Sequence, residues 1–204
     1  EIRDQETAQI AVQASLTGHL VFSTLHTNDA AGALTRLVDM GVEPYLVASS
    51  LEAVLAQRLV RLLCPHCKQV DTTPESRVYR AKLGIKPDAT VYRAVGCREC
   101  RNTGYHGRRA IFEWMDSSTE IRSLILKNGS TAAIRATARR AGMKTLAEDG
   151  RRLVEEGITT IEEILSVTTL HEMESSEANT KLNGHAPATN GAKDRQAALP
   201  RSLL

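Results

Sequence analysis

Apolar residues recur at helical spacing through much of the chain, and short apolar runs typical of strands separate the first of these segments. The pattern predicts helices at Gln5–Leu16, 30–40 and 44–49, with Gly18 and Gly41 just past the ends of the first two. Glycine suits the left-handed backbone that often ends a helix, so both of these ends are marked in the sequence.

Two short runs in this first part favour β-strands. Residues 19–25 are apolar and β-prone, as a central strand would be. Residues 1–4 fit the end of another buried strand, with Asp4 as the N-cap of the helix that follows. Because strand and helix alternate, we expect an α/β fold whose strands lie parallel in one sheet.

The remainder of the chain predicts two more strands and a series of helices. Residues 54–62 fit a helix or a strand on periodicity alone, and we favour a strand because a doubly wound sheet lacks one at this point. Residues 108–115 predict a strand that returns to the main body. From about residue 170 few residues are apolar, which predicts a disordered tail. Helices are expected at 119–126, 131–140, 146–156 and 161–167.

The composition is that of an ordinary globular protein. Of the 204 residues, 42% are hydrophobic and 25% are charged, and the formal net charge is +2. This charge argues against a dedicated nucleic-acid-binding protein, which usually has a strongly basic face. The sequence has no apolar run near the roughly 18 residues that span a bilayer and no cleavable signal. The missing signal, together with the thiolate metal site predicted below, leads us to expect a protein of the reducing cytoplasm. It opens on Glu1 without an initiator methionine, so we expect a piece of something larger.

All four cysteines fall in two Cys-x-x-Cys pairs with 29 residues between the pairs. Two intervening residues form a tight turn in which both sulfurs can face one ion, and two such turns complete the tetrahedral thiolate site that Zn²⁺ favours. We therefore predict a zinc site with the ligands Cys64, Cys67, Cys97 and Cys100. Two disulfides, four unconnected thiols or a redox-active pair are the alternatives. His66 and His106 stand beside the pairs, and either could replace a thiolate as a ligand. Because four cysteines are already available, we favour a role outside the ligand set, or none, for both histidines.

Two groups of polar residues within the first thirty positions are candidates for binding or catalysis. Glu1 ends a predicted strand and is followed by Arg3 and Asp4, and His26 follows the next predicted strand. Ligands of open α/β sheets bind beyond the carboxyl ends of the strands, where a carboxylate can orient water or hydrated Mg²⁺ and an imidazole can donate to phosphate. From the residues alone, structural roles for His26 and Glu1 remain open.

Several ordered motifs resemble one family. Residues 1–8, Glu-Ile-Arg-Asp-Gln-Glu-Thr-Ala, resemble the Walker B signature of the type II secretion and type IV pilus assembly ATPases. Residues 17–28 resemble the histidine box of that family, and residues 39–44, 56–61 and 104–108 continue the match in register. The four cysteines lie where the secretion and assembly members carry theirs, whereas pilus-retraction members generally lack them. The resemblance spans about residues 1–169.

The resemblance implies a role for each site residue. Glu1 would polarise the attacking water and help to place Mg²⁺, with Arg3 and Asp4 beside it holding the loop. His26 would contact the γ-phosphate of ATP, and His19 would support the histidine box from its strand. The family works as a hexameric ring that hydrolyses ATP at the inner membrane, where it drives pseudopilin or pilin assembly through a platform protein.

The implied organisation is the C-terminal part of a RecA-like ATPase. We expect a partial core at 1–63, an inserted zinc lobe at 64–107, a returning strand with a helical subdomain at 108–169 and a tail at 170–204. The sequence contains no GxxxxGK[ST] phosphate-binding loop, so we expect this chain alone neither to bind ATP tightly nor to hydrolyse it. The alternative function is a zinc-ribbon adaptor that binds nucleic acid or protein through the basic residues of the lobe.

Overall fold

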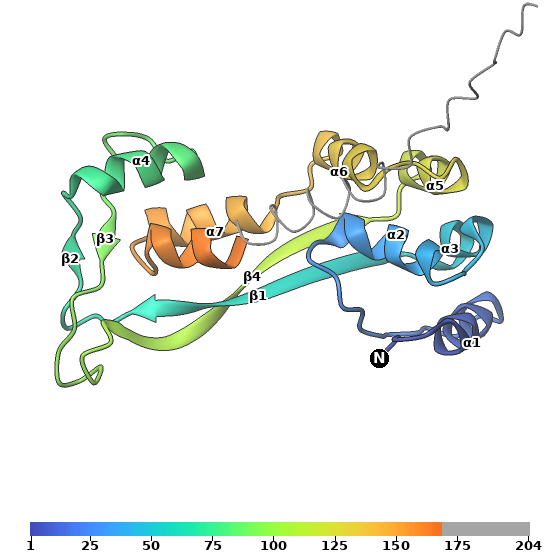
Figure 1. Cartoon of the computed structure of the whole chain (residues 1–204), viewed down its shortest axis with the longest axis horizontal. Helices are drawn as coiled ribbons and strands as arrows, with labels where there is room; N and C mark the ends of the chain where they lie inside the picture. Colours follow the sequence, from blue (N-terminus) through green and yellow to red (C-terminus); the bar gives the residue numbers. More distant parts are fainter. Residues whose placement is uncertain (169–204) are drawn as a thin grey trace, which may run out of the picture.

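The computed structural model describes residues 1–168. Its largest element of β-structure is a long two-stranded ribbon. Strands β1 (Ala53–Leu63) and β4 (Tyr105–Asp116) pair antiparallel, from Ala53 opposite Asp116 to Arg61 opposite Arg108, with one register shift before Leu63. The ribbon runs along most of the molecule, and the helices are arranged around it, some in contact with the ribbon and others with neighbouring helices (Figure 1). The predicted strands at 54–62 and 108–115 are thus confirmed.

Five helices gather around one end of the ribbon (Figure 1). Their shared core includes Leu34, Val47, Met115, Ile121 and Ile134. Because Met115 comes from β4, this cluster joins the first part of the chain to the helices after the ribbon. The five helices are α1 (Gln5–Leu16), α2 (Ala30–Asp39), α3 (Pro44–Ser50), α5 (Thr119–Leu126) and α6 (Thr131–Arg140).

A second core lies further along the ribbon. There α7 (Leu146–Glu155) packs on both strands, and α4 (Pro74–Leu83) packs on α7. A last helix at 161–168 contributes Ile161 and Ile164 to the same core. The short strands β2 (Gln69–Val70) and β3 (Tyr92–Arg93), which precede and follow α4 in the sequence, pair antiparallel with each other. The buried members of this core are Val60, Leu83, Ile85, Val91, Ile111, Leu146, Leu153, Val154, Ile161 and Ile164.

Polar N-caps explain where most helices begin. Asp4, Asp29, Ser118 and Ser130 each accept a backbone N–H from the first turn of the helix that follows, which satisfies a donor that has no partner inside the helix. Thr145 forms a full capping box with Glu148. The predicted helix bounds therefore agree with the structure to within one residue.

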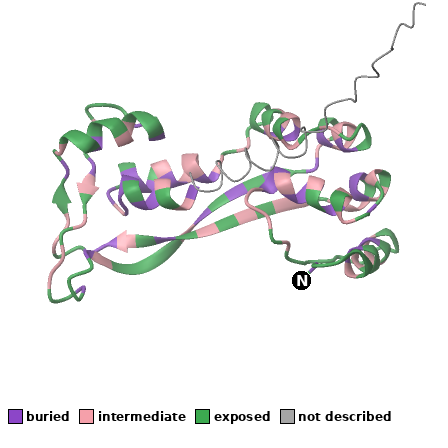
Figure 2. Ribbon diagram, viewed as in Figure 1, coloured by how far each residue is buried: buried purple, intermediate pink, exposed green. Residues whose placement is uncertain are grey.

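The predicted parallel sheet is wrong for the part of the chain that the structure describes. Residues 19–25 are not a strand, and residues 1–4 do not end one. Their backbones share a single hydrogen bond, from Ile2 N to Thr24 O at 2.9 Å, and a strand requires a ladder of such bonds. Leu20 and Phe22 are 81% and 88% exposed, and of the apolar residues in this run Leu25 packs against the core near the helices. The segment that leads from α1 to α2 is largely exposed (Figure 2).

One helix of the structure was not predicted from the sequence. No helix was expected at 74–83, yet Pro74 at its start and Gly84 in left-handed conformation after its end are ordinary helix signals.

The predicted tail at 170–204 lies outside the described residues. Within residues 1–168, no helix combines the length and apolarity needed to cross a membrane.

Glu163 attaches the last helix to the edge of β1. Its carboxylate is 7% exposed and accepts three hydrogen bonds from Arg61, from the backbone N–H at 3.0 Å, Nε at 2.9 Å and Nη2 at 2.6 Å. Burial alone would raise the pKa of Glu163, but the bonds from Arg61 outweigh it and hold that pKa below the usual range. The pair therefore stabilises the fold most when Glu163 is ionised.

We expect E163Q to lower the free energy of unfolding by about 2 kcal/mol at pH 7, because an amide cannot replace the charge-assisted bonds. Since the folded pKa is lowered, this contribution is present above the unfolded pKa and is lost as the pH falls through the folded value. The difference between wild type and variant should therefore shrink between pH 6 and pH 3 in urea unfolding. E162Q, at the exposed neighbouring position, is the control and should match wild type at both pH values. A difference that does not change with pH would contradict this account.

Candidate functional site

Glu1, Arg3 and His26 form one contact group. The Glu1 Oε1 atom lies 2.5 Å from His26 Nε2, and Glu1 Oε2 accepts a bond of 2.6 Å from Arg3 Nη2. The bond from Arg3 is the main cause that lowers the pKa of Glu1, with a smaller contribution from His26. Glu1 is therefore held as a carboxylate with both of its oxygens engaged.

Local backbone contacts bring these residues together. Ile2 is buried, and its N–H donates to Thr24 O, which places the start of the chain beside the segment that leads to His26. Asp4 lies next to the group but has another task, since its Oδ1 accepts the Thr7 N–H at 2.8 Å and caps α1. That bond also lowers the pKa of Asp4. The His26 side chain itself is 82% exposed.

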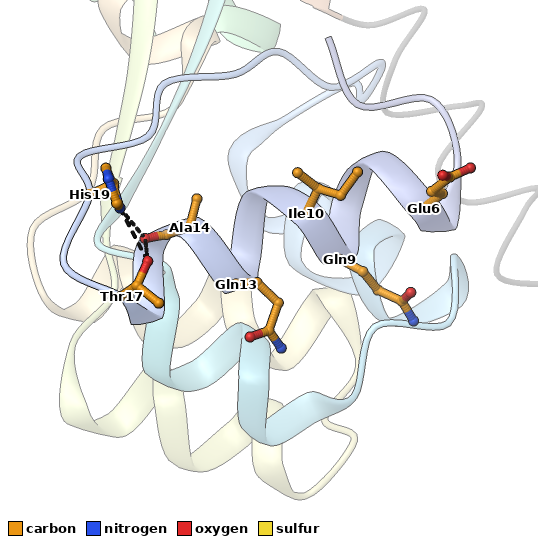
Figure 3. A pocket seen from close by; sticks show the side chains of 7 residues that line it. All are labelled: Glu6, Gln9, Ile10, Gln13, Ala14, Thr17 and His19. Atoms are coloured by element: carbon orange, nitrogen blue, oxygen red, sulfur yellow. Dashed lines mark hydrogen bonds between the residues drawn. The ribbon is translucent and has the colours of Figure 1, made fainter.

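His19 is not brought to this group. Its Nδ1 lies 3.1 Å from Thr17 Oγ1 and 3.2 Å from Ala14 O, so it packs on the C-terminal end of α1 (Figure 3). There it lines an open groove along one side of α1 whose other residues are Glu6, Gln9, Ile10, Gln13, Ala14 and Thr17. Neither Glu1 nor His26 lines this hollow, so the groove is separate from the chemical group.

Sequence reasoning missed one buried carboxylate near His26. Glu113 in β4 is 3% exposed, and its Oε1 accepts the N–H of Ala30, the first residue of α2, at 2.9 Å. The backbone N–H groups of Ala30 and of Leu146, which begins α7, both act to lower the pKa of this carboxylate. Burial raises the pKa of Glu113 despite these bonds. No sequence pattern announces a contact between residues 83 positions apart.

The four cysteines converge on one point. Their Sγ atoms all lie within 4.8 Å of one another, with 3.9 Å between Cys64 and Cys97, 3.9 Å between Cys67 and Cys100, and 3.8 Å between Cys97 and Cys100. A disulfide would need about 2.05 Å, and all four thiols are free. Four thiolates about 2.3 Å from a tetrahedral Zn²⁺ are separated by about 3.8 Å, so the cluster fits such an ion.

Backbone N–H groups near the two turns donate to two of the four sulfurs. Cys100 Sγ accepts the N–H groups of Cys97 and Gly104, both at 3.2 Å, and Cys67 Sγ accepts that of Gly96 at 3.4 Å. Burial would raise the pKa of Cys100, but these two N–H groups lower it to about 6. Thiolate, the form that binds metal, is thereby favoured at this position.

Two glycines allow the chain to close around the cluster. Gly96 and Gly104 have φ values of +113° and +77°, and a Cβ atom on Gly104 would lie 2.6 Å from the Cβ of Ala94. His66 and His106 are both exposed and lie outside the group of converging sulfurs. The ligand set that the structure assembles is therefore the four cysteines alone.

A family model described as "Type II/IV secretion system protein" matches residues 1–166. The chain belongs to this family. The match covers the contact group of Glu1 as well as the cysteine cluster, so the resemblance expected from the motifs is confirmed.

Curated relatives carry names from both branches of the family. The chain is 55% identical over 170 residues to type II secretion system protein E of Pseudomonas aeruginosa, a match that covers 82% of this chain and 33% of that protein. It is 51% identical over 172 residues to the type IV pilus assembly ATPase PilB of Thermus thermophilus, covering 82% of this chain and 19% of the relative. The chain thus spans a third or less of the length of these relatives.

Solved structures share the fold. The pilus retraction motor PilT with bound ADP aligns with a TM-score of 0.53 at 23% identity, over 82% of this chain and 37% of that one. The ATPase DotB of Legionella pneumophila aligns with a TM-score of 0.52 at 22% identity, over 82% of this chain and 36% of that one. The chain therefore has an α/β fold like that of DotB and PilT.

Proposed function

We propose that this chain is part of an ATP-hydrolysing motor for protein secretion or pilus assembly. The observation that carries the proposal is the 2.5 Å contact between Glu1 and His26, with Arg3 on the second oxygen of Glu1. A carboxylate and an imidazole at this separation, in the matched segment of a secretion family, suit phosphoryl transfer to water. The alternative zinc adaptor gains no comparable support.

Each residue of the group has a distinct task in this proposal. Glu1 accepts a hydrogen bond from the attacking water and helps to place Mg²⁺, and Arg3 keeps its carboxylate ionised and oriented. His26, which contacts Glu1 before nucleotide binds, exchanges this contact for the γ-phosphate of ATP and donates to it from Nε2. Asp4 acts indirectly by starting α1, and His19 supports the segment between α1 and His26 from the end of that helix. ATP with Mg²⁺ supplies the phosphoryl group that is transferred.

The zinc site has a structural role in the proposal. Four thiolates fill a tetrahedral Zn²⁺ and leave no position for a substrate, so the ion would hold the end of the ribbon where β1 leaves and β4 returns. We infer a RecA-like core at 1–63, a lobe at 64–107 that is inserted into it, and a returning strand and helical subdomain from residue 108. The lobe then offers a surface to a membrane-bound partner.

The wider assembly is proposed from the resemblance to the family. We propose a hexameric ring that is formed by the full-length protein in the cytoplasm, at the inner membrane, where a platform protein receives its motion. Pseudopilins or pilins are the cargo class. Both names occur among the relatives at similar identity, which supports the general motor and leaves secretion and pilus assembly as two versions of it.

We expect the 204-residue chain alone to show no ATP turnover above background, whereas the full-length protein hydrolyses ATP. The reason is that backbone N–H groups and a lysine of a GxxxxGK[ST] loop supply most of the binding of the phosphates, and the sequence of this chain has no such run. Phosphate release at millimolar ATP and Mg²⁺ measures both proteins side by side. A full-length protein without ATPase activity would contradict the proposed function. Turnover by the chain alone that E1Q abolishes would contradict its dependence on the missing loop.

A further inference from the structure

The residues directly after His26 are held by parts of the chain far away in sequence. His26 is 82% exposed, and its imidazole contacts Glu1 from a segment that is neither helix nor strand. Residues 27–30 link this segment to α2, and they bond to β1, β4 and α6. The position of the imidazole therefore depends on how these four residues are fixed.

Asp29 is the most heavily used of the four. Its Oδ1 accepts the Gly32 N–H at 2.7 Å, which caps α2, and its Oδ2 forms an ion pair with Nη2 of Arg135 in α6. The side chains are 19% and 31% exposed, so water screens this pair less than it screens a surface pair. A hydrogen bond of 3.1 Å between Thr35 and Thr131 joins the same two helices.

Two further residues hold the link from the ribbon. Glu113 of β4 accepts the N–H of Ala30 at 2.9 Å from a fully enclosed position. Nη2 of Arg58 in β1 lies 3.5 Å from Thr27 O and 3.4 Å from Asn28 O. Every residue of the link thus has a partner on another element, which is more than a surface turn needs for stability.

We propose that Arg135 is a positioning residue for ATP hydrolysis, acting through Asp29 to fix residues 27–30 and so to hold His26 against Glu1. Glu113 and Arg58 complete the hold from the two strands of the ribbon. The inference rests on the proposed function, and it gives the C-terminal helices a part in the reaction that their distance in sequence hides. A displacement of α6 would reach His26 through one ion pair.

The test compares R135Q, R135K and R140Q in the full-length protein. Arg140 is the matched control, because it lies on the same helix and is exposed, and within residues 1–168 its side chain bonds only to Thr137 of its own helix. We expect R135Q to lower kcat for ATP hydrolysis about tenfold while KM for ATP stays within about twofold, since a misplaced group harms the chemical step more than binding. R135K keeps a charge that can reach Asp29 and should recover most of kcat.

Hydrogen exchange of the same proteins without nucleotide separates this inference from the proposed function. The amides of Ala30 and Gly32 should exchange about tenfold faster in R135Q than in wild type, and R140Q should match wild type. Unchanged exchange, or faster exchange with unchanged kcat, would overturn the positioning role. If the wild-type protein does not hydrolyse ATP, the proposed function fails, and unchanged exchange in R135Q would then overturn the link between Arg135 and the residues after His26 as well.

Discussion

The variant E1Q of the full-length protein is expected to lose at least about 100-fold in kcat for ATP hydrolysis, the range in which positioned carboxylates contribute to proton transfer. An amide keeps the size of the side chain but cannot accept a proton from water, and its NH₂ group would face Arg3 or His26 in place of a carboxylate oxygen. ATP affinity should stay within a few-fold, because the proposed role of Glu1 is to act on the attacking water and not to hold the phosphates. Steady-state phosphate release and equilibrium nucleotide binding measure the two quantities.

E6Q is the control for this variant. Glu6 lies in the first turn of α1, is exposed, and is separated from the contact group by the capping residue Asp4. It should retain kcat within about twofold, as surface substitutions usually do. If E1Q retained the wild-type rate while E6Q lost it, the assignment of the carboxylate would be wrong.

Removal of one cysteine should remove the metal. Protein purified without added zinc is expected to contain one zinc ion per chain, and C97S should contain less than about one-tenth of that, since structural zinc sites depend on all of their ligands. The change should reach beyond the turns, because Leu63 N donates to Ile158 O at 2.8 Å and Lys68 Nζ donates to Gly157 O at 2.8 Å. We therefore expect faster hydrogen exchange at 157–163 as well as around the cysteines.

H66A tests whether the effect is specific to the thiolates. His66 lies between Cys64 and Cys67 but is exposed, so the variant should keep one zinc per chain and the wild-type exchange pattern. Elemental analysis together with thiol titration decides the matter. Wild-type protein that contains no metal and four reactive thiols would contradict the site.

The helices could be predicted from the sequence because their signals are local. Asp4, Ser118 and Thr145 each stand directly before an apolar pattern at helical spacing, and each caps the expected helix. The helix at 74–83 has the same kind of signals in Pro74 and Gly84 and could have been found from them. The ribbon was predicted from its strands, although its antiparallel pairing was not.

The strand at 19–25 could not be judged from its own residues. Its apolar pattern is that of a buried strand, yet burial depends on partners from other parts of the protein, and Leu20 and Phe22 find none in the described chain. A strand forms only where its backbone makes a ladder of hydrogen bonds with a neighbouring strand, so the apolar pattern of a segment does not by itself determine one. The matched region makes up only 33% and 19% of the length of two relatives.

The residues of the candidate site also fall into those that the sequence predicts and those that it does not. The cysteine pairs determine their own geometry through their spacing, and the structure brings all four sulfurs together as expected. The family motifs single out Glu1 and His26 separately, whereas the contact between the two is seen only in the structure. Arg135 and Glu113 were missed because their partners Asp29 and Ala30 lie 106 and 83 positions away, and single charged residues in a strand or helix carry no mark of such contacts.

The most direct test of the whole account is a crystal structure of the full-length protein with Mg²⁺ and a non-hydrolysable ATP analogue. The account predicts that His26 Nε2 lies within hydrogen-bond distance of a γ-phosphate oxygen, and that an ordered water lies between that phosphate and the carboxylate of Glu1. A nucleotide whose γ-phosphate is far from both side chains would contradict the assignment of this group as the site of hydrolysis.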